Sequence, residues 1–411
     1  MSGPNRIVLI GGGLASIAAI EALRNEGYEG GIMLISDESE LPYDRPPLSK
    51  TYLSAEVNLQ QILLHDQAWY DDMKVELVLG VAAQRIDPTS HQVHLDDGRS
   101  VQYDRLLIAT GARPRALPET VIELGAGVHY LRTRADADQL RTIVQPGARV
   151  VLIGGGVIGM ETAATLALMG CQVTVLEGSD RIMARFFPPL LSERLARVHA
   201  KNGVDVRTGV VIERVFQEGN QSVVCLANGD VLTADILVVG IGVIPNAEIA
   251  MKAGIELEQN GVRTDSRGET SVPGIFASGD VATFPLPDGS MIRWENWTHA
   301  RLHAAHVVRH MLDKDSEYNE QPWVWSDQYD LNIQVLGSSV SEDAPILRGC
   351  LDHGKLTALH ISGGILVGAT MINDGKSKSS ARKLLGRAVS GELREQLADA
   401  TMDLKKIVAS L

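Results

Sequence analysis

Gly11 and Gly13 are the first residues whose type and spacing suit a particular chemistry. They follow the apolar run RIVLI and precede a helical pattern, with Ser16 where a third glycine completes the G-x-G-x-x-G fingerprint. The first glycine permits a tight turn, and the second lets a pyrophosphate approach the backbone at a helix N-terminus. Asp37 follows the next apolar run, GIMLIS, where an acid can accept a hydrogen bond from a ribose hydroxyl.

The fingerprint recurs in full at RVVLIGGGVIGMETAA, from Gly154 to Gly159. Glu177 closes the following apolar run. An acid at this place accepts from the 2′-hydroxyl of NAD and repels the 2′-phosphate of NADP, so the sequence favours NADH over NADPH. Arg181 and Arg185 follow closely, and they leave open the alternative that a 2′-phosphate is bound.

The segment LPYDRPPLSK, from Leu41 to Lys50, is here called the proline elbow. Pro46 and Pro47 suit the start of a short helix, so Lys50 is expected to project from its first turn. Taken alone, such a lysine is most often a solvated surface residue. Glu161, early in the helix after the second fingerprint, can likewise be read as a carboxylate that complements the helix dipole.

Two further segments indicate an internal duplication. DGRSVQYDRLLIATGARP aligns without gaps on NGDVLTADILVVGIGVIP, and each pair, such as Asp104 and Asp235, is 131 residues apart. Each copy predicts a glycine-containing hairpin, an aspartate and a buried strand, so we expect an α/β fold with two Rossmann-like units. VPGIFASGDVA then places Asp280 after an apolar strand, where it either accepts a ribose or ribityl hydroxyl or caps a helix.

Four histidines recur at 4-3-4 spacing, which places them on one face of a predicted helix: His299, His303, His306 and His310. One straight helix does not easily surround a tetrahedral zinc ion, so no metal site is predicted. The three cysteines, Cys171, Cys225 and Cys350, are too scattered for a disulfide framework or a Cys-x-x-Cys pair, and we expect buried structural thiols.

Composition excludes several classes of protein. With 45% hydrophobic and 22% charged residues, the chain resembles an ordinary soluble globular protein. Its net charge of −13 argues against general binding to nucleic acid or an anionic membrane. No apolar run approaches the roughly 18 residues of a membrane span, so a cytoplasmic location is expected. A local basic cluster could still dock an acidic partner or form a solvated face: Lys376, Lys378, Arg382, Lys383 and Arg387.

The segments GGGLAS, ATG, GGGVIG and GIFASGDVA together resemble the glutathione-reductase-like flavoproteins with two dinucleotide-binding domains. YDRPPLSK, YLRTRADA, WENWTHA and WVWSDQ are similar to the ferredoxin reductases of bacterial oxygenase systems, nearest to those that serve aromatic-ring dioxygenases. The resemblance implies an FAD domain at 1–113 and 245–321, an NAD domain at 114–244 and an α+β C-terminal domain at 322–411.

The resemblance also implies which residues bind the cofactors. Those expected to bind FAD are Gly11, Gly13, Leu14, Ala15, Asp37, Arg45, Lys50, Ala83, Ala109, Thr110, Gly111, Arg132, Asp280 and Trp297. Those expected to bind NAD(H) are Gly154, Gly156, Val157, Ile158, Gly159, Glu161, Glu177, Arg185 and Gly242. Lys50 is expected beside the flavin and paired with Glu161, and these two are the predicted catalytic residues.

The implied activity is electron transfer from NADH through FAD to a small ferredoxin, most simply a Rieske-type ferredoxin that feeds an aromatic-ring-hydroxylating oxygenase. Because no cysteine precedes Cys171, a redox dithiol near the proline elbow is excluded. The ferredoxin is expected to dock on Lys376, Lys378, Arg382 and Lys383. Alternatives are a rubredoxin or putidaredoxin type of reductase serving a P450 or alkane hydroxylase, an NADH oxidase, or a redox-sensed interaction flavoprotein.

Overall fold

The computed structural model describes residues 4–123, 125, 127–339, 343–351 and 354–411. The chain folds into two compact units, each made of three segments. The first unit is Met1–Arg45, Asn58–Arg113 and Val243–Pro322, and the second is Pro46–Val57, Pro114–Gly242 and Trp323–Leu411. No described helix is long and apolar enough to cross a membrane.

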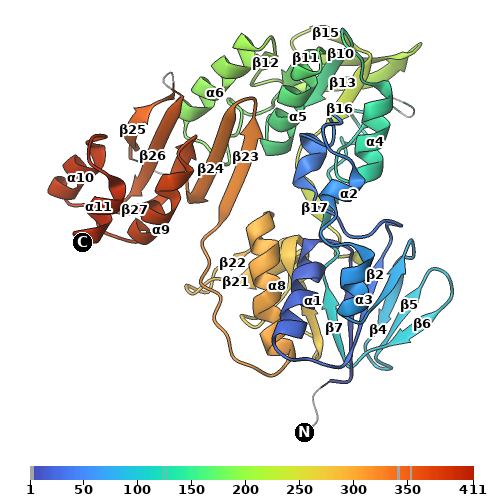
Figure 1. The fold of residues 1–411 in the computed structure, drawn as a ribbon. Helices are drawn as coiled ribbons and strands as arrows, with labels where there is room; N and C mark the ends of the chain where they lie inside the picture. The colour runs from blue at the N-terminus through green and yellow to red at the C-terminus, as the bar shows by residue number, and fades with distance from the viewer. Residues whose placement is uncertain (1–3, 124, 126, 340–342, 352–353) are drawn as a thin grey trace. The chain divides into compact units, whose positions relative to one another are not determined.

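A five-stranded parallel sheet forms the centre of the first unit. Its strand order is β20 (Ile275–Ala277), β7 (Arg105–Ile108), β1 (Arg6–Ile10), β2 (Gly31–Ser36) and β3 (Val75–Leu79). Helices α1 (Leu14–Asn25) and α8 (Trp297–Met311) run side by side in Figure 1 and share a buried core with this sheet. The strands are nearly continuous apolar runs because helices and other segments cover both faces of the sheet.

Smaller elements complete the first unit. The short helices are α2 (Leu59–Ile62), α3 (Gln67–Asp72), α7 (Glu248–Lys252) and the 3₁₀ turn η2 (Gly279–Val281). One small sheet contains β4 (Ala83–Asp87), β5 (Gln92–Leu95) and β6 (Ser100–Gln102). Another contains β18 (Leu257–Glu258), β19 (Gly261–Arg263), β21 (Ala282–Pro285) and β22 (Met291–Ile292), and β8 (Ala112–Pro114) pairs with β17 (Val243–Pro245).

The second unit contains a second parallel sheet. Its order is β12 (Asp205–Arg207), β11 (Gln172–Leu176), β10 (Arg149–Ile153), β16 (Ile236–Val239) and β9 (Val128–His129). An antiparallel sheet follows, with β13 (Ile212–Glu218), β14 (Gln221–Leu226) and β15 (Val231–Ala234). The helices of this part are η1 (Pro46–Ser49), α4 (Arg134–Ile143), α5 (Val157–Leu168) and α6 (Pro189–Lys201).

The C-terminal part of the second unit is α+β. Its antiparallel sheet has the order β23 (Trp323–Gln328), β24 (Leu331–Gly337), β27 (Ile365–Ile372), β26 (Lys355–Ser362) and β25 (Ile346–Cys350). The 3₁₀ turn η4 (Gly375–Ser377) and helices α9 (Lys378–Leu384), α10 (Gly391–Ala398) and α11 (Leu404–Ala409) follow. One apolar core includes residues of α5 and α6 together with residues of β24 and β26.

The two parallel sheets repeat the same backbone contacts. Gly11 and Gly154 have φ values of 114° and 115°, and a Cβ at either would lie 2.3 Å from a carbonyl oxygen of the neighbouring strand end. The carboxylate of Asp104 accepts the N–H of Arg6 at 2.8 Å, and that of Asp235 accepts the N–H of Arg149 at 2.9 Å. The fold predicted from the duplicated motifs, two Rossmann-like units followed by an α+β part, is confirmed.

The four histidines of α8 line one buried face of that helix. The rings of His299 and His303 stack with centroids 4.6 Å apart, and His306 and His310 meet edge-on at 4.8 Å. Tyr318 donates or accepts a hydrogen bond at Nδ1 of His299 over 2.8 Å. Within the described part of the chain, no group of three or more histidine, cysteine or acidic residues is arranged to hold a metal ion. Ring stacking and hydrogen bonds hold much of this face, whereas Nε2 of His299 is buried without a hydrogen-bond partner among the described residues.

This histidine face predicts a loss of stability in mild acid. Burial lowers the pKa of His299 from its ordinary value of 6.5 to about 3, and burial also lowers the pKa of His303 strongly. The unfolded chain binds these protons below about pH 6.5 and the folded chain does not, so each such histidine removes about 1.4 kcal/mol of stability per pH unit. The stability is complete above that pH and is lost as the pH falls.

We expect His303→Phe to weaken this pH dependence, because phenylalanine fills the stack without a titrating nitrogen. The measurement is hydrogen-exchange protection of α8 between pH 5 and 7, corrected for the intrinsic exchange rate. A pH dependence equal to that of the unmodified protein would contradict the assignment. His91→Phe, at an exposed turn of the same unit, is the control and should leave the dependence unchanged.

Candidate functional site

The loop before α1 forms an amide cradle suited to a pyrophosphate. Gly13 caps the helix without any side chain, and a Cβ built there would meet nothing within 4 Å. Leu14 and Ala15 begin the helix, whose first amides have no partner within the helix, and no acid lies in its first turn. Ser16 donates its hydroxyl to the carbonyl of Gly11 at 2.6 Å. An anionic group fits this cradle in charge and space.

Other predicted flavin residues of the first unit lie around this cradle. A Cβ at Gly279 would lie 3.1 Å from Cβ of Ala15, so the segment that carries Asp280 packs against the start of α1. Ala109 contacts Gly11 through its carbonyl group. Asp37 follows β2 directly and is exposed. The structure therefore brings the glycine turn, the Ala109 turn and the Asp280 segment together.

The turn from Thr110 to Gly111 is fixed by Asn246. The hydroxyl of Thr110 donates to the carbonyl of Asn246 at 2.7 Å, and the Asn246 side chain donates to the carbonyl of Thr110 at 3.0 Å. Gly111 has a φ of 64°, which favours glycine. Ala83 begins β4, and its assignment to FAD stays a prediction.

Arg45 and Trp297 both meet acids that the sequence reading did not select. Arg45 donates to Glu38 at 2.6 Å, and the Tyr43 hydroxyl donates to the same carboxylate. The indole nitrogen of Trp297 donates to Asp44 at 2.8 Å. In the sequence, the acidic run DESE just before the elbow could have indicated Glu38 as a partner for Arg45. These contacts hold the first half of the proline elbow within the first unit.

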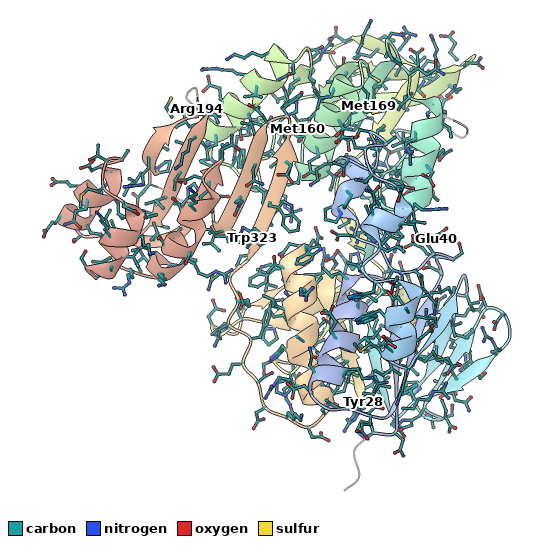
Figure 2. All side chains as sticks on the ribbon, viewed as in Figure 1. Tyr28, Glu40, Met160, Met169, Arg194 and Trp323 are labelled. Atoms are coloured by element: carbon teal, nitrogen blue, oxygen red, sulfur yellow. The ribbon has the colours of Figure 1, made fainter. Side chains whose placement is uncertain are left out.

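The second amide cradle lies before α5. Gly156 caps the helix, Val157 and Ile158 begin it, and a Cβ at Gly159 would lie only 2.0 Å from the Gly154 carbonyl oxygen. A side chain at position 159 would thus push the helix away from the loop. The amide donors at the helix start again fit a pyrophosphate. Figure 2 labels Met160, the next residue of this helix, which is buried in the core.

Glu177 organises the loop after β11. Its carboxylate accepts the N–H of Gly155 at 2.6 Å and the N–H of Ser179 at 2.7 Å. Arg181, the alternative phosphate ligand, instead pairs with Asp180 at 2.9 Å. Arg185 is exposed.

Two other predicted cofactor residues lie elsewhere in the chain. Gly242 has a φ of 104° and open space at its Cβ position, and Arg132 precedes the capped start of α4. The cofactor assignments of Arg185, Gly242 and Arg132 stay predictions.

Lys50 and Glu161 lie together within the second unit. The Lys50 ammonium donates to Oε1 of Glu161 at 3.1 Å, and its nitrogen lies 3.7 Å from a carboxylate oxygen of Asp327. Two hydroxyls also donate to Glu161, Ser49 to Oε2 at 2.5 Å and Ser326 to Oε1 at 2.8 Å. The 3₁₀ turn η1, which starts at the two prolines as predicted, positions Ser49 and Lys50.

The Glu161 carboxylate has an unusual environment for a charged group. Its side chain is 2% exposed, whereas that of Lys50 is 15% exposed. Burial raises the pKa of Glu161, and Lys50, Ser49 and Ser326 oppose that rise. Glu161 lies beyond the first turn of α5, and its carboxylate contacts Ser49, Lys50 and Ser326, so complementing the helix dipole does not account for its position. The sequence offered no signal for Ser326 except its place in WVWSDQ.

The basic cluster of the C-terminal part is only partly free of other contacts. The Lys378 ammonium lies 3.8 Å from the centre of the Trp323 ring, and Trp323 stacks on Trp325 at 5.2 Å. Figure 2 labels Trp323 at the start of β23. Lys376 and Lys383 are exposed. Lys378 thus has a structural contact as well as the charge expected for docking.

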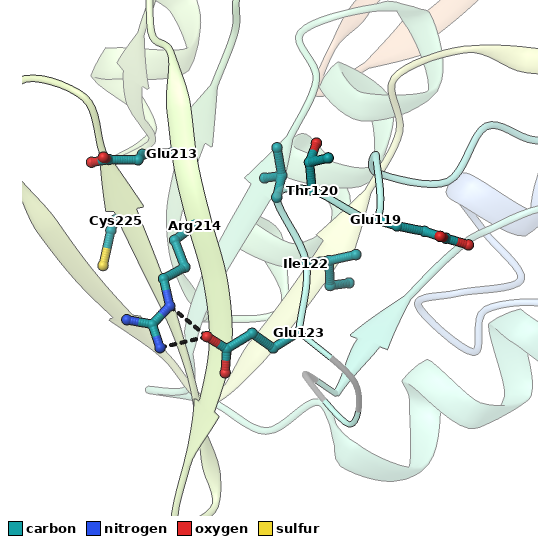
Figure 3. A pocket seen from close by; sticks show the side chains of 8 residues that line it. Glu119, Thr120, Ile122, Glu123, Glu213, Arg214 and Cys225 are labelled. Carbon is teal, nitrogen blue, oxygen red and sulfur yellow. Dashed lines mark hydrogen bonds and ion pairs between the residues drawn. The ribbon is translucent and has the colours of Figure 1, made fainter.

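Cys225 and Cys350 are only partly buried, so the expectation of buried thiols holds for Cys171 alone. Cys225 faces a cavity of about 390 Å³ between β13, β14 and the segment Glu119–Glu123. Figure 3 shows the ion pair between Arg214 and Glu123 at this cavity. None of the predicted cofactor residues lines it.

Comparison with known proteins gives matches along nearly the whole chain. The family described as pyridine nucleotide-disulphide oxidoreductase matches residues 5–304, and a region described as reductase C-terminal matches residues 323–408. The ferredoxin–NAD(+) reductase component of the anthranilate 1,2-dioxygenase system of Burkholderia cepacia is 37% identical, over 97% of this chain and 98% of that protein. Rhodocoxin reductase of Rhodococcus erythropolis is 36% identical, over 98% of this chain and 94% of that protein.

Among solved structures, a chain of the covalent putidaredoxin reductase–putidaredoxin complex has a TM-score of 0.92 at 32% identity, covering 100% of this chain and 99% of that one. The family uses FAD and NAD(H), and both amide cradles fit dinucleotide pyrophosphates. The chain therefore belongs to the pyridine nucleotide-disulphide oxidoreductase family and is an FAD- and NAD(H)-dependent oxidoreductase with a reductase C-terminal region.

Proposed function

We propose that the protein passes electrons from NADH through FAD to a small iron–sulfur ferredoxin, of the Rieske type, that feeds an aromatic-ring-hydroxylating oxygenase. The observation that carries the proposal is the full-length likeness to a ferredoxin–NAD(+) reductase component of a dioxygenase system. The two amide cradles support the cofactors, with FAD assigned to the Gly11 cradle and NAD(H) to the Gly154 cradle.

The division into domains belongs to the same proposal. We assign FAD binding to 1–113 and 245–321, NAD(H) binding to 114–244, and a C-terminal α+β domain to 322–411. In the structure, residues 46–57, which include the second half of the proline elbow, group with the second unit, and that unit also carries Glu161. A cytoplasmic location stays a prediction.

Lys50 and Glu161 are the residues that we place at the reaction. Bound FAD supplies the hydride acceptor and passes electrons on. The Lys50 ammonium supplies a positive charge that stabilises negative charge developing beside it, and a partly buried position makes that charge effective. Glu161 fixes the direction of Lys50 and offers an acceptor to the amide N–H of a nicotinamide.

The electrons then leave for an external carrier. The first cysteine of the sequence is Cys171, and the three thiols of the chain are free, so the chain supplies no dithiol ahead of that residue. A basic surface at Lys376, Lys378, Arg382 and Lys383 suits an acidic ferredoxin. Likeness to rhodocoxin reductase and to the putidaredoxin complex favours a second candidate, a reductase that serves a P450 or alkane hydroxylase.

We expect a Rieske-type ferredoxin to be the fastest of three acceptors offered to the NADH-reduced protein, because the likeness to a dioxygenase component favours it. The measurement is stopped-flow oxidation of the protein by a Rieske-type ferredoxin, a plant-type ferredoxin and a rubredoxin. Faster transfer to the plant-type ferredoxin or to rubredoxin would support the second candidate, and slow transfer to every carrier would support an interaction protein.

A charge reversal separates docking from chemistry in the same assay. Lys376→Glu combined with Lys383→Glu should slow reduction of the ferredoxin and flatten its salt dependence. Ferricyanide reduction should be unaffected. The matched control, Lys201→Glu with Lys252→Glu, makes the same charge change at exposed lysines elsewhere. Equal effects of the two pairs would overturn the docking surface.

Lys50→Met should slow flavin reduction by NADH by roughly tenfold or more, because it removes a positive charge from the reacting region. It should also lower the flavin midpoint potential, since the charge that develops on reduction loses its partner. Rapid-reaction spectroscopy and a potentiometric titration give the two quantities. Lys355→Met is the control. Lys355 is in the same unit and also forms an ion pair, with Asp374 at 2.9 Å, but its side chain is exposed. The assignment is wrong if rate, potential and FAD content all stay normal.

Glu177 should make the protein prefer NADH to NADPH, because its carboxylate repels a 2′-phosphate. Glu177→Gln retains an acceptor for the Gly155 amide, removes the charge, and should reduce the NADH:NADPH ratio of kcat/KM by roughly tenfold. Steady-state kinetics with the two nucleotides measures this ratio. Equal kcat/KM values in the unmodified protein would remove the role given to Glu177.

A further inference from the structure

A chain of four hydrogen bonds runs through the second unit and ends at Glu161. It joins Tyr329 OH to His199 Nδ1 at 3.1 Å, and His199 Nε2 to Gln328 Oε1 at 2.8 Å. Gln328 Nε2 then contacts Ser326 Oγ at 2.9 Å, and Ser326 Oγ contacts Glu161 Oε1 at 2.8 Å. These residues come from α5, α6, β23 and the turn after β23.

The chemistry of the groups gives this chain one direction. The Gln328 amide nitrogen can only donate, so the Ser326 oxygen accepts its proton and the single Ser326 proton goes to the carboxylate. The Gln328 oxygen can only accept, so His199 carries its proton on Nε2 and accepts from Tyr329 at Nδ1. Burial lowers the pKa of His199, in keeping with a neutral ring. Each group therefore orients the next one toward Glu161.

Water has little access to the inner members of this chain. His199 is fully buried, and Ser326 and Gln328 are 2% and 1% exposed. A polar group left without its partner at such depth has no water to replace it. Loss of the His199 donor therefore frees the Gln328 amide to rotate, and the Ser326 hydroxyl can then turn away from Glu161 toward the Gln328 oxygen.

The turn that carries Tyr329 places the tyrosine side chain against His199. Tyr329 has a φ of 56° in the short connection between β23 and β24, where glycine, asparagine or aspartate is favoured. Its ring packs edge-on against His199, with centroids 5.1 Å apart. A tyrosine thus occupies a backbone conformation that is strained for it, and there its side chain contacts the His199 ring.

We propose that His199 is a positioning residue that acts through Gln328 and Ser326 to orient the Glu161 carboxylate, and thereby sets the affinity for the nicotinamide end of NAD(H). The proposal rests on the role given above to Glu161. Among the described residues, Lys50, Ser49 and Ser326 contact that carboxylate, and Asp327 lies beside Lys50. Of these contacts, the one from Ser326 is linked by hydrogen bonds to His199.

The test is a double-mutant cycle on the FAD-loaded protein, with binding of NAD⁺ measured by calorimetry. His199→Phe and Ser326→Ala should each raise the Kd for NAD⁺ by about fivefold, and the double variant should raise it no further. ADP-ribose lacks nicotinamide, so its Kd should be unchanged in all three variants. His199→Gln, whose amide nitrogen can reach the Gln328 oxygen, should restore most of the NAD⁺ affinity.

A matched control separates this role from general loosening of the fold. His360 is also fully buried in the second unit, and its Nε2 lies 2.8 Å from the hydroxyl of Thr370, with no connection to Glu161 in the described contacts. His360→Phe should lower thermal stability but leave both dinucleotide affinities unchanged. Equal weakening of NAD⁺ and ADP-ribose binding by His199→Phe would overturn the proposal.

Glu161→Gln distinguishes failure of this proposal from failure of the proposed function. If Glu161→Gln binds NAD⁺ as tightly as the unmodified protein, the role of Glu161 is wrong and that of His199 falls with it. If Glu161→Gln weakens binding and His199→Phe does not, only the role of His199 is overturned. Nitrogen-15 NMR of the unmodified protein should show His199 protonated on Nε2, and protonation on Nδ1 would also contradict the proposal.

Discussion

The arrangement of the second unit depends on the hydrogen bonds and the ion pair that the buried Glu161 carboxylate makes. A carboxylate that is only 2% exposed must find several donors, because removing one partner from a buried ion pair costs about 3–5 kcal/mol. Its donors are Lys50, Ser49 and Ser326, which lie more than 100 residues away along the chain. The elbow, α5 and β23 must therefore all be in place before this charge is satisfied.

The same requirement explains how the second unit is assembled from three distant segments. Leu53, just after the elbow, belongs to the apolar core that also contains Met160 of α5 and Ile333 of β24. The hydroxyl of Thr165 donates to the carbonyl of Ser49 at 2.8 Å, one helical turn beyond Glu161. Apolar packing thus brings the segments together, and the polar contacts then determine their register, because a shift would leave a buried charge unpaired.

The sequence predicts those features that depend on local backbone geometry. Gly11 and Gly154 signal the tight turns, because any Cβ there meets a carbonyl oxygen, and β-branched runs identify the buried strands. The 4-3-4 spacing correctly places the histidines on one face of α8. Partners such as Ser326 for Glu161 and Asp44 for Trp297 are not predictable, because a hydroxyl or carboxylate carries no periodic signal and its partner is set by tertiary packing.

The two amide cradles differ in their side-chain contacts but share the features that depend on local backbone geometry. Both copies retain the left-handed glycine and the aspartate that pairs with the first strand, since the backbone of either sheet needs them. The acid after the second strand differs: Asp37 is exposed, whereas Glu177 already binds the amides of Gly155 and Ser179. In the proposed assignment of Glu177 to a ribose, a carboxylate held in this way is already ordered before a nucleotide binds. The backbone requirements of the two copies are alike, whereas the acids after their second strands differ in exposure and contacts.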